Sequence, residues 1–127
     1  LRLSSAASDV YKRQQYEWSA HEPLAQAAGL EQEIIEVIKY RKNLGGLSTI
    51  AGLGATERLL IQFTRELVSE EKVSSDTYAQ AIEHFGSEGL MDIVGLIGYH
   101  NFMAMTLKAF DVQRPIGTEL LLPMSVD

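Results

Sequence analysis

Apolar residues recur at helical spacing along most of the chain, and no stretch of convincing length alternates as a β-strand does. Thr56 and Ser75 stand where they can cap two of the helices, and Gly86 stands where one should end. The glycine-rich stretch between residues 43 and 55 predicts a loop. The pattern therefore predicts an all-α bundle, with helices over residues 16–28, 30–42, 57–71, 76–85 and 90–110.

The last predicted helix, residues 90–110, is apolar nearly all the way round. Such a helix should be buried on more than one side, and in a short chain this predicts that a second subunit covers part of it. A membrane-spanning role is disfavoured, because polar side chains are costly in hydrocarbon. The helix carries four of them: Asp92, His100, Asn101 and Lys108.

Length and composition narrow the class of protein. The 127 residues are enough for one domain with a core, and 46% of them are hydrophobic. The net charge is −6 and no basic cluster occurs, which disfavours a nucleic-acid partner. No cysteine is present, so disulfides and thiol redox chemistry are excluded. The first residues lack the apolar segment of a secretory signal, and we expect a cytoplasmic protein.

The stretch QQYEWSAHEPLAQAAGL, residues 14–30, concentrates groups that could do chemistry. Glu17 and His21 are four positions apart, so on a helix their side chains are neighbours. A carboxylate beside an imidazole fixes its tautomer and raises its pKa, which favours proton transfer near neutrality. Trp18 could exclude water or stack on a planar substrate. The alternative is an ordinary intrahelical pair with the tryptophan packed in the core.

The remaining histidines and methionines predict mainly structural roles. His84 stands at a helix end, where a surface role is expected. His100, beside Tyr99, is expected as a hydrogen-bonded core residue, although both could face the same pocket as Glu17. A metal site would need a third ligand such as His100 or Glu22. The methionines of the last helix are expected to pack in the core: Met91, Met103 and Met105.

From Gln14 to about Val112 the chain resembles the carboxymuconolactone decarboxylase and alkylhydroperoxidase D-like family. The resemblance rests on QYEWSAHEPLAQAAGL and on FTRELVSEEKVSSDTYAQAIEHFGSEGLMDIVGLIGYHNFMAMTLKAFDV. The peroxidase branch of that family has a C-x-x-C-x-x-x-H block. On this block Gln14 and Glu17 stand at the cysteines and His21 at the histidine. The resemblance implies an alkylhydroperoxidase D-like helical bundle that assembles as a homo-oligomer, a trimer or hexamer.

The departure from the peroxidase pattern decides which activity the resemblance implies. Glutamate and glutamine cannot cycle between thiol and disulfide, so peroxidase chemistry through a dithiol is ruled out. The chain is closer to the decarboxylase branch, which uses no metal or organic cofactor on a small carboxylated lactone or related acid. The resemblance then implies His21 as proton donor and Glu17 as the group that orients it. Its expected substrate-binding residues are Trp18, Gln14, Tyr99 and His100. A non-catalytic, oligomeric, small-molecule-binding protein of the same fold is the alternative.

The resemblance also divides the chain into three parts. Residues 1–13 are not family-like, and their DVYKRQ ending resembles translated adapter sequence in a metagenomic assembly, so we expect a non-native leader. Residues 14–112 are expected to form the decarboxylase-like domain, incomplete at its N-terminus. Residues 113–127 hold two prolines and predict an extended tail.

Overall fold

A computed structural model of the chain describes residues 22–29, 32–40, 42, 44, 53–112 and 117. Within these residues every regular element is a helix and no strand occurs, which confirms the all-α class. The named helices are α3 (Gln32–Lys39), α4 (Ala55–Ser69) and α5 (Ser75–Ala109). The predicted leader 1–13 lies outside the described residues, as does nearly all of the predicted tail 113–127.

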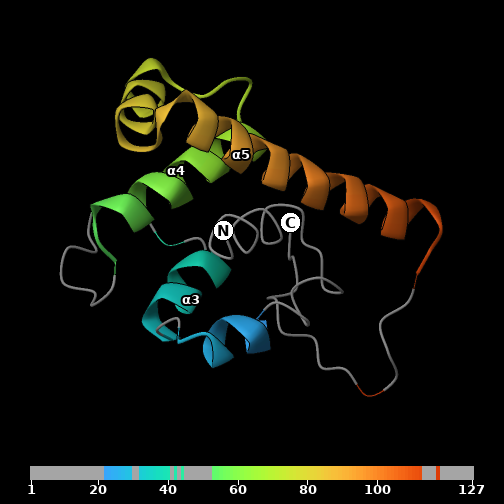
Figure 1. Cartoon of the computed structure of the whole chain (residues 1–127). Coiled ribbons are helices and arrows are strands. Elements are labelled where there is room, and N and C mark those ends of the chain that lie inside the picture. The colour runs from blue at the N-terminus through green and yellow to red at the C-terminus, as the bar shows by residue number, and fades with distance from the viewer. Residues whose placement is uncertain are drawn as a thin grey trace.

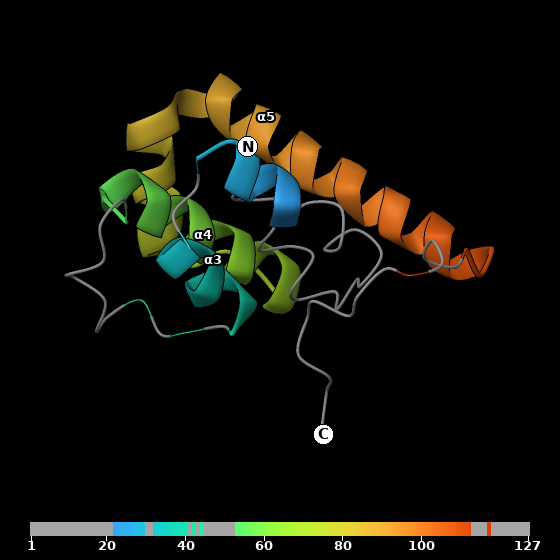
Figure 2. The ribbon, with the colours of Figure 1, turned by 90° about the horizontal axis from the view of Figure 1, so that it is seen from below.

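The N-terminal described segment is helical over residues 22–27 and lies within the predicted helix 16–28, which ends at Gly29. Gly29 has a φ of 90°, and its N–H donates to the carbonyl of Gln26 at 3.1 Å. This left-handed geometry at a helix end is one that glycine adopts without strain. α3 follows and lies beside α4, on the side of α4 away from α5 (Figure 1, Figure 2). Its buried residues are Ile34, Ile35, Val37 and Ile38.

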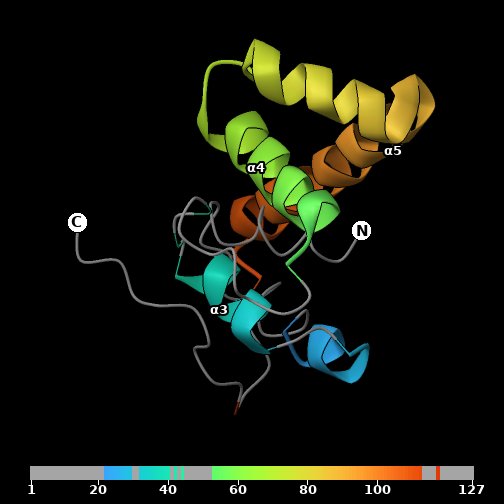
Figure 3. The ribbon, with the colours of Figure 1, turned by 90° about the vertical axis from the view of Figure 1, so that its left-hand side faces the viewer.

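One cluster of the buried core lies between α4 and α5. Between these helices the chain reverses, and both halves of α5 lie against α4 (Figure 3). Phe63 of α4 is buried with Ala81 from the first half of α5. Leu90, Ile93 and Ile97 from the second half complete the same cluster. Apolar residues recur every three or four positions on these faces, so their burial supplies most of the driving force for this pairing.

α5 changes direction at Gly86, where two predicted helices join without a loop (Figure 1, Figure 2). Gly86 has φ 72° and ψ 171°, a backbone region essentially restricted to glycine. The prediction that Gly86 ends the helix over residues 76–85 is therefore confirmed in its local geometry. The next helix begins at once, rather than near Leu90 as the pattern predicted.

Both predicted helix caps are displaced. Thr56 was expected to cap α4, but Gly54 is the N-cap and makes no side-chain cap bond. Ser75 was expected to cap α5, but Ser74 is the N-cap and its hydroxyl accepts from the N–H of Thr77 at 3.3 Å. Both errors are of one or two positions. At α5 the adjacent Ser74 and Ser75 offer nearly equivalent capping oxygens, whereas at α4 the hydroxyl of Thr56 is bonded elsewhere and the N-cap is a glycine.

The second half of α5 is buried on one side only. Met91 and Met105 are each 68% exposed, so the prediction that these methionines pack in the core is wrong for this chain by itself. Met103 is half-buried. α5 is also the one described helix long and apolar enough to cross a membrane, with 22% of its most apolar window buried. That test rests on length and composition, which a core helix of a soluble protein also meets.

Candidate functional site

Four of the predicted site residues lie outside the described residues: Gln14, Glu17, Trp18 and His21. The residue directly after them in the chain is described. Glu22 is buried, and its Oε2 lies 3.6 Å from Nζ of Lys39 on α3. Separating a buried ion pair leaves an uncompensated buried charge, which is strongly destabilising. The pair therefore holds the chain next to His21 against α3.

The two other predicted substrate-binding residues, Tyr99 and His100, are adjacent on α5 and lie on different sides of it. Tyr99 is 57% exposed, whereas His100 is half-buried. Their rings are 5.6 Å apart at the centroids and nearly perpendicular. Whether either residue faces Glu17 stays a prediction.

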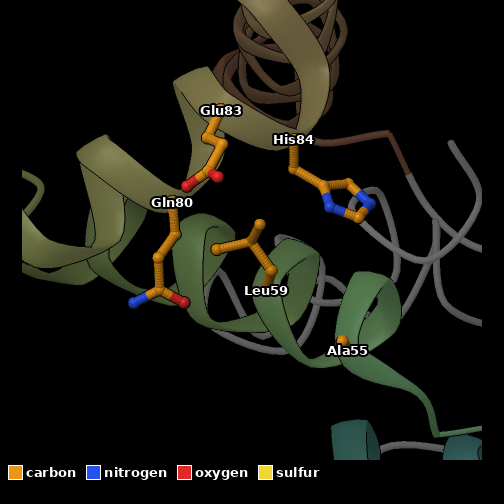
Figure 4. A pocket seen from close by; sticks show the side chains of 5 residues that line it. All are labelled: Ala55, Leu59, Gln80, Glu83 and His84. Atoms are coloured by element: carbon orange, nitrogen blue, oxygen red, sulfur yellow. The ribbon is translucent and has the colours of Figure 1, made fainter.

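An open pocket lies between α4 and the first half of α5 (Figure 4). Its volume is about 420 Å³. Ala55 and Leu59 contribute apolar surface from α4, and three polar side chains come from α5: Gln80, Glu83 and His84. The pocket is thus lined mainly by polar side chains, which could donate and accept hydrogen bonds to a small polar molecule.

His84 is positioned in this pocket by a hydrogen bond across the two helices. Its Nε2 lies 2.6 Å from Oγ1 of Thr56, and its ring packs edge-on against Phe85. The predicted surface position of His84 is correct, since its side chain is exposed. Its pairing with Thr56 was missed, because the two residues are 28 positions apart and no local pattern joins them. Thr56 thus bonds His84 instead of capping its own helix.

A buried carboxylate, Glu66, joins the end of α4 to the start of α5. It accepts three hydrogen bonds: from Oγ1 of Thr77 at 2.6 Å, from the N–H of Ser74 at 2.8 Å and from Nε2 of Gln62 at 2.8 Å. Burial alone would raise the pKa of Glu66, but these hydrogen bonds outweigh it and lower the pKa from 4.5 to about 2. Because its oxygens are satisfied by the protein, Glu66 is a structural group rather than a proton carrier.

Arg65, the neighbour of Glu66, joins α4 to the end of α3. It is buried and donates from Nη2 to the carbonyl of Val37 at 3.1 Å and from Nη1 to the carbonyl of Lys42 at 2.9 Å. The last carbonyls of a helix lack intrahelical partners, and a guanidinium satisfies them while favouring the negative end of the helix dipole. Neither Arg65 nor Glu66 was singled out from the sequence, where they are two charges on an amphipathic helix.

The described residues contain no group of three His, Asp or Glu side chains that could hold a metal ion. The metal site considered from the sequence would require Glu17 and His21. These two lie outside the described part, so that hypothesis is not tested.

Comparison of the chain with family models, with curated proteins and with solved structures finds no match. The resemblance to the carboxymuconolactone decarboxylase and alkylhydroperoxidase D-like family therefore remains a hypothesis carried by the sequence blocks around Glu17 and in α4 and α5.

Proposed function

We propose that the protein is a cofactor-independent carboxy-lyase acting on a small carboxylated lactone or related acid, in the cytoplasm. The observation that carries the proposal is the four-residue spacing of Glu17 and His21, which would make their side chains neighbours in the predicted helix over residues 16–28. Two further observations are consistent with it. The described chain is all-α, as the resemblance implies, and Glu22 ties the chain next to His21 to α3.

In the proposed reaction the bond between the carboxylate and its neighbouring carbon breaks and carbon dioxide leaves. The electron pair of that bond passes into an adjacent carbonyl of the substrate, giving an enolate. His21, protonated and oriented by Glu17, then donates a proton to the carbon that lost the carboxylate. Trp18 and Gln14 are within four positions of this pair in the sequence, one turn or less if the predicted helix includes them, and would contact the substrate.

Carbon dioxide release from a panel of carboxylated lactones and β-keto acids tests the proposal. Wild type would be assayed beside Glu17→Gln, with Glu71→Gln as the matched control, because Glu71 is exposed just after α4. Turnover on at least one substrate, reduced by about 100-fold or more in Glu17→Gln only, supports the proposal. Turnover unaffected by Glu17→Gln would assign the chemistry to other residues.

The second candidate is a non-catalytic, small-molecule-binding protein, and the pocket at His84 favours it. The pocket offers a hydrogen-bonded imidazole, a carboxylate and an amide around an apolar floor. A screen of small carboxylic acids, followed by the NMR signals of the His84 ring, tests this candidate. A saturable shift that is lost in Gln80→Ala, without carbon dioxide release, would favour binding over catalysis.

A further inference from the structure

The half of α5 that follows Gly86 has two apolar faces, and the described residues of the chain pack against only one of them. Ile93, Ile97 and Ala104 are buried. The opposite face carries a row of exposed residues, here called the outer stripe: Met91, Gly95, Gly98, Phe102, Met105 and Ala109. Its members are separated by four, three, four, three and four positions. This alternation keeps all of them on one line along the helix and is the spacing at which two helices pair over a long distance.

When the outer stripe is laid against a second copy of itself in the opposite direction, each large side chain faces a small one. In an antiparallel pair with position 100 at the twofold axis, Met91 lies opposite Ala109 of the second copy. Gly95 then lies opposite Met105, and Gly98 opposite Phe102. Every layer joins one large residue to one small one. In a parallel pair, by contrast, Phe102 would meet Phe102 and Gly98 would meet Gly98, so overfilled and empty layers would alternate.

The space that this pairing needs is open. A Cβ atom placed on Gly95 or on Gly98 would meet no atom within 4 Å. The large residues that would enter this space stand away from their own chain, since Phe102 is 64% exposed and Met105 is 68% exposed.

Charge favours the same orientation. Asp92 stands near the start of the outer stripe and Lys108 near its end, and both are exposed. Antiparallel pairing brings Lys108 of one copy to the level of Asp92 of the other. Parallel pairing would instead place Asp92 level with Asp92 of the second copy and Lys108 level with Lys108, so like charges would repel. It would also align the two helix dipoles in the same direction, which is unfavourable.

We propose that a second copy of this chain covers the outer stripe in an antiparallel, twofold-symmetric helix pair with position 100 at its axis. This inference does not rest on the proposed lyase activity. A twofold contact of this kind builds a dimer, or the twofold contacts of a hexamer, and cannot by itself build a trimer. Between the trimer and the hexamer that the family resemblance implies, it therefore favours the hexamer or the dimer from which a hexamer is built.

Crosslinking tests the register, because the chain has no cysteine of its own. Tyr99 flanks the outer stripe next to the axis, so Tyr99→Cys should be joined to its own copy by a short bismaleimide. Met91 lies about 27 Å along the pair from Met91 of the second copy, at about 1.5 Å per residue. Met91→Cys should therefore not be joined, and neither should Tyr78→Cys, which is exposed in the first half of α5. Efficient crosslinking of Met91→Cys, or none of Tyr99→Cys, would overturn the proposed register.

Analytical ultracentrifugation tests the contact itself. Wild type should have a mass at least twice the 14.1 kDa of one chain, and Tyr78→Glu should keep it. Phe102→Glu should weaken association by at least 10-fold while its circular dichroism stays that of wild type, since Phe102 is exposed in the single chain. Gly98→Leu should act in the same way, because its side chain enters open space in one chain but takes the position of Phe102 in the pair. Association that is unchanged in both variants overturns the proposal.

A lipid bilayer is the other apolar surface that this helix could meet. A wild-type chain that stays monomeric at all concentrations overturns the proposal. If that monomer also sediments with phosphatidylcholine vesicles, and Phe102→Glu does not, the outer stripe is assigned to a membrane instead.

Discussion

At the scale of single residues, Arg65 holds more of the described structure together than its sequence position indicates. Its two carbonyl partners lie in the last turn of α3, on Val37, and just after this helix, on Lys42. Removing the guanidinium would remove both of these hydrogen bonds from a buried, charged donor, at a cost of about 1–3 kcal/mol. We therefore predict that Arg65→Ala lowers the free energy of unfolding by about 2–3 kcal/mol in urea denaturation.

The control for this prediction is Lys72→Ala, which removes an exposed charge in the turn between α4 and α5. It should change the free energy of unfolding by no more than about 0.5 kcal/mol. Equal effects of the two substitutions would show that Arg65 acts only through the net charge of the chain.

At the scale of elements, the junction of α4 and α5 should make stability depend on acid pH. The pKa of Glu66 is about 2 in the folded chain and 4.5 as the reference for an unfolded one. A lowered folded pKa contributes stability above the unfolded value, and this contribution is lost as pH falls from about 5 to about 2. A difference of this size corresponds to a contribution on the order of 3 kcal/mol.

We predict that Glu66→Gln is less stable than wild type at pH 7 and that this difference shrinks steadily as pH falls toward 2. Urea denaturation at a series of pH values measures it. Glu70→Gln, an exposed neighbour, should follow the wild-type curve. A difference that stays constant with pH would mean that the carboxylate charge does not stabilise the junction.

The direction change within α5 makes a second prediction at this scale. Gly86 has room for a Cβ, since no atom lies within 4 Å of that position, so any cost of Gly86→Ala comes from the backbone angles alone. Such strain costs about 1–3 kcal/mol. Gly86→Ala should lower the thermal midpoint, whereas Ser87→Ala, exposed at the next position, should leave it nearly unchanged. A stabilised Gly86→Ala chain would indicate that α5 can run straight.

The same elements show how far the sequence alone predicts this structure. Periodicity located α3, α4 and both halves of α5, because apolar spacing is a local property of the chain. Hydrogen bonds between elements were not predicted: Thr56 with His84, Arg65 with Val37, and Glu66 with Ser74. Each depends on how two helices meet, which local spacing does not determine. Met91 and Met105 were expected in the core because apolar spacing cannot tell a face buried within one chain from a face buried between two.

At the scale of the whole molecule, the scaffold and the proposed reaction rest on different residues. The α4–α5 core, the Arg65 and Glu66 contacts and the outer stripe describe how the chain folds and what covers it. The proposed chemistry rests on Glu17 and His21, which precede the described part and are connected to it through Glu22. The structural contacts and the proposed activity can therefore be tested by different variants. A result that contradicts one of them does not contradict the other.

The most direct test of the proposed function is carbon dioxide release by His21→Ala compared with wild type on carboxylated lactones and β-keto acids, with circular dichroism showing that both chains are folded. We predict that wild type releases carbon dioxide from at least one of these substrates and that His21→Ala is slower by about 100- to 10,000-fold, the usual contribution of a general acid. Equal rates in the two chains, or no release by wild type from any member of the panel, would contradict the account.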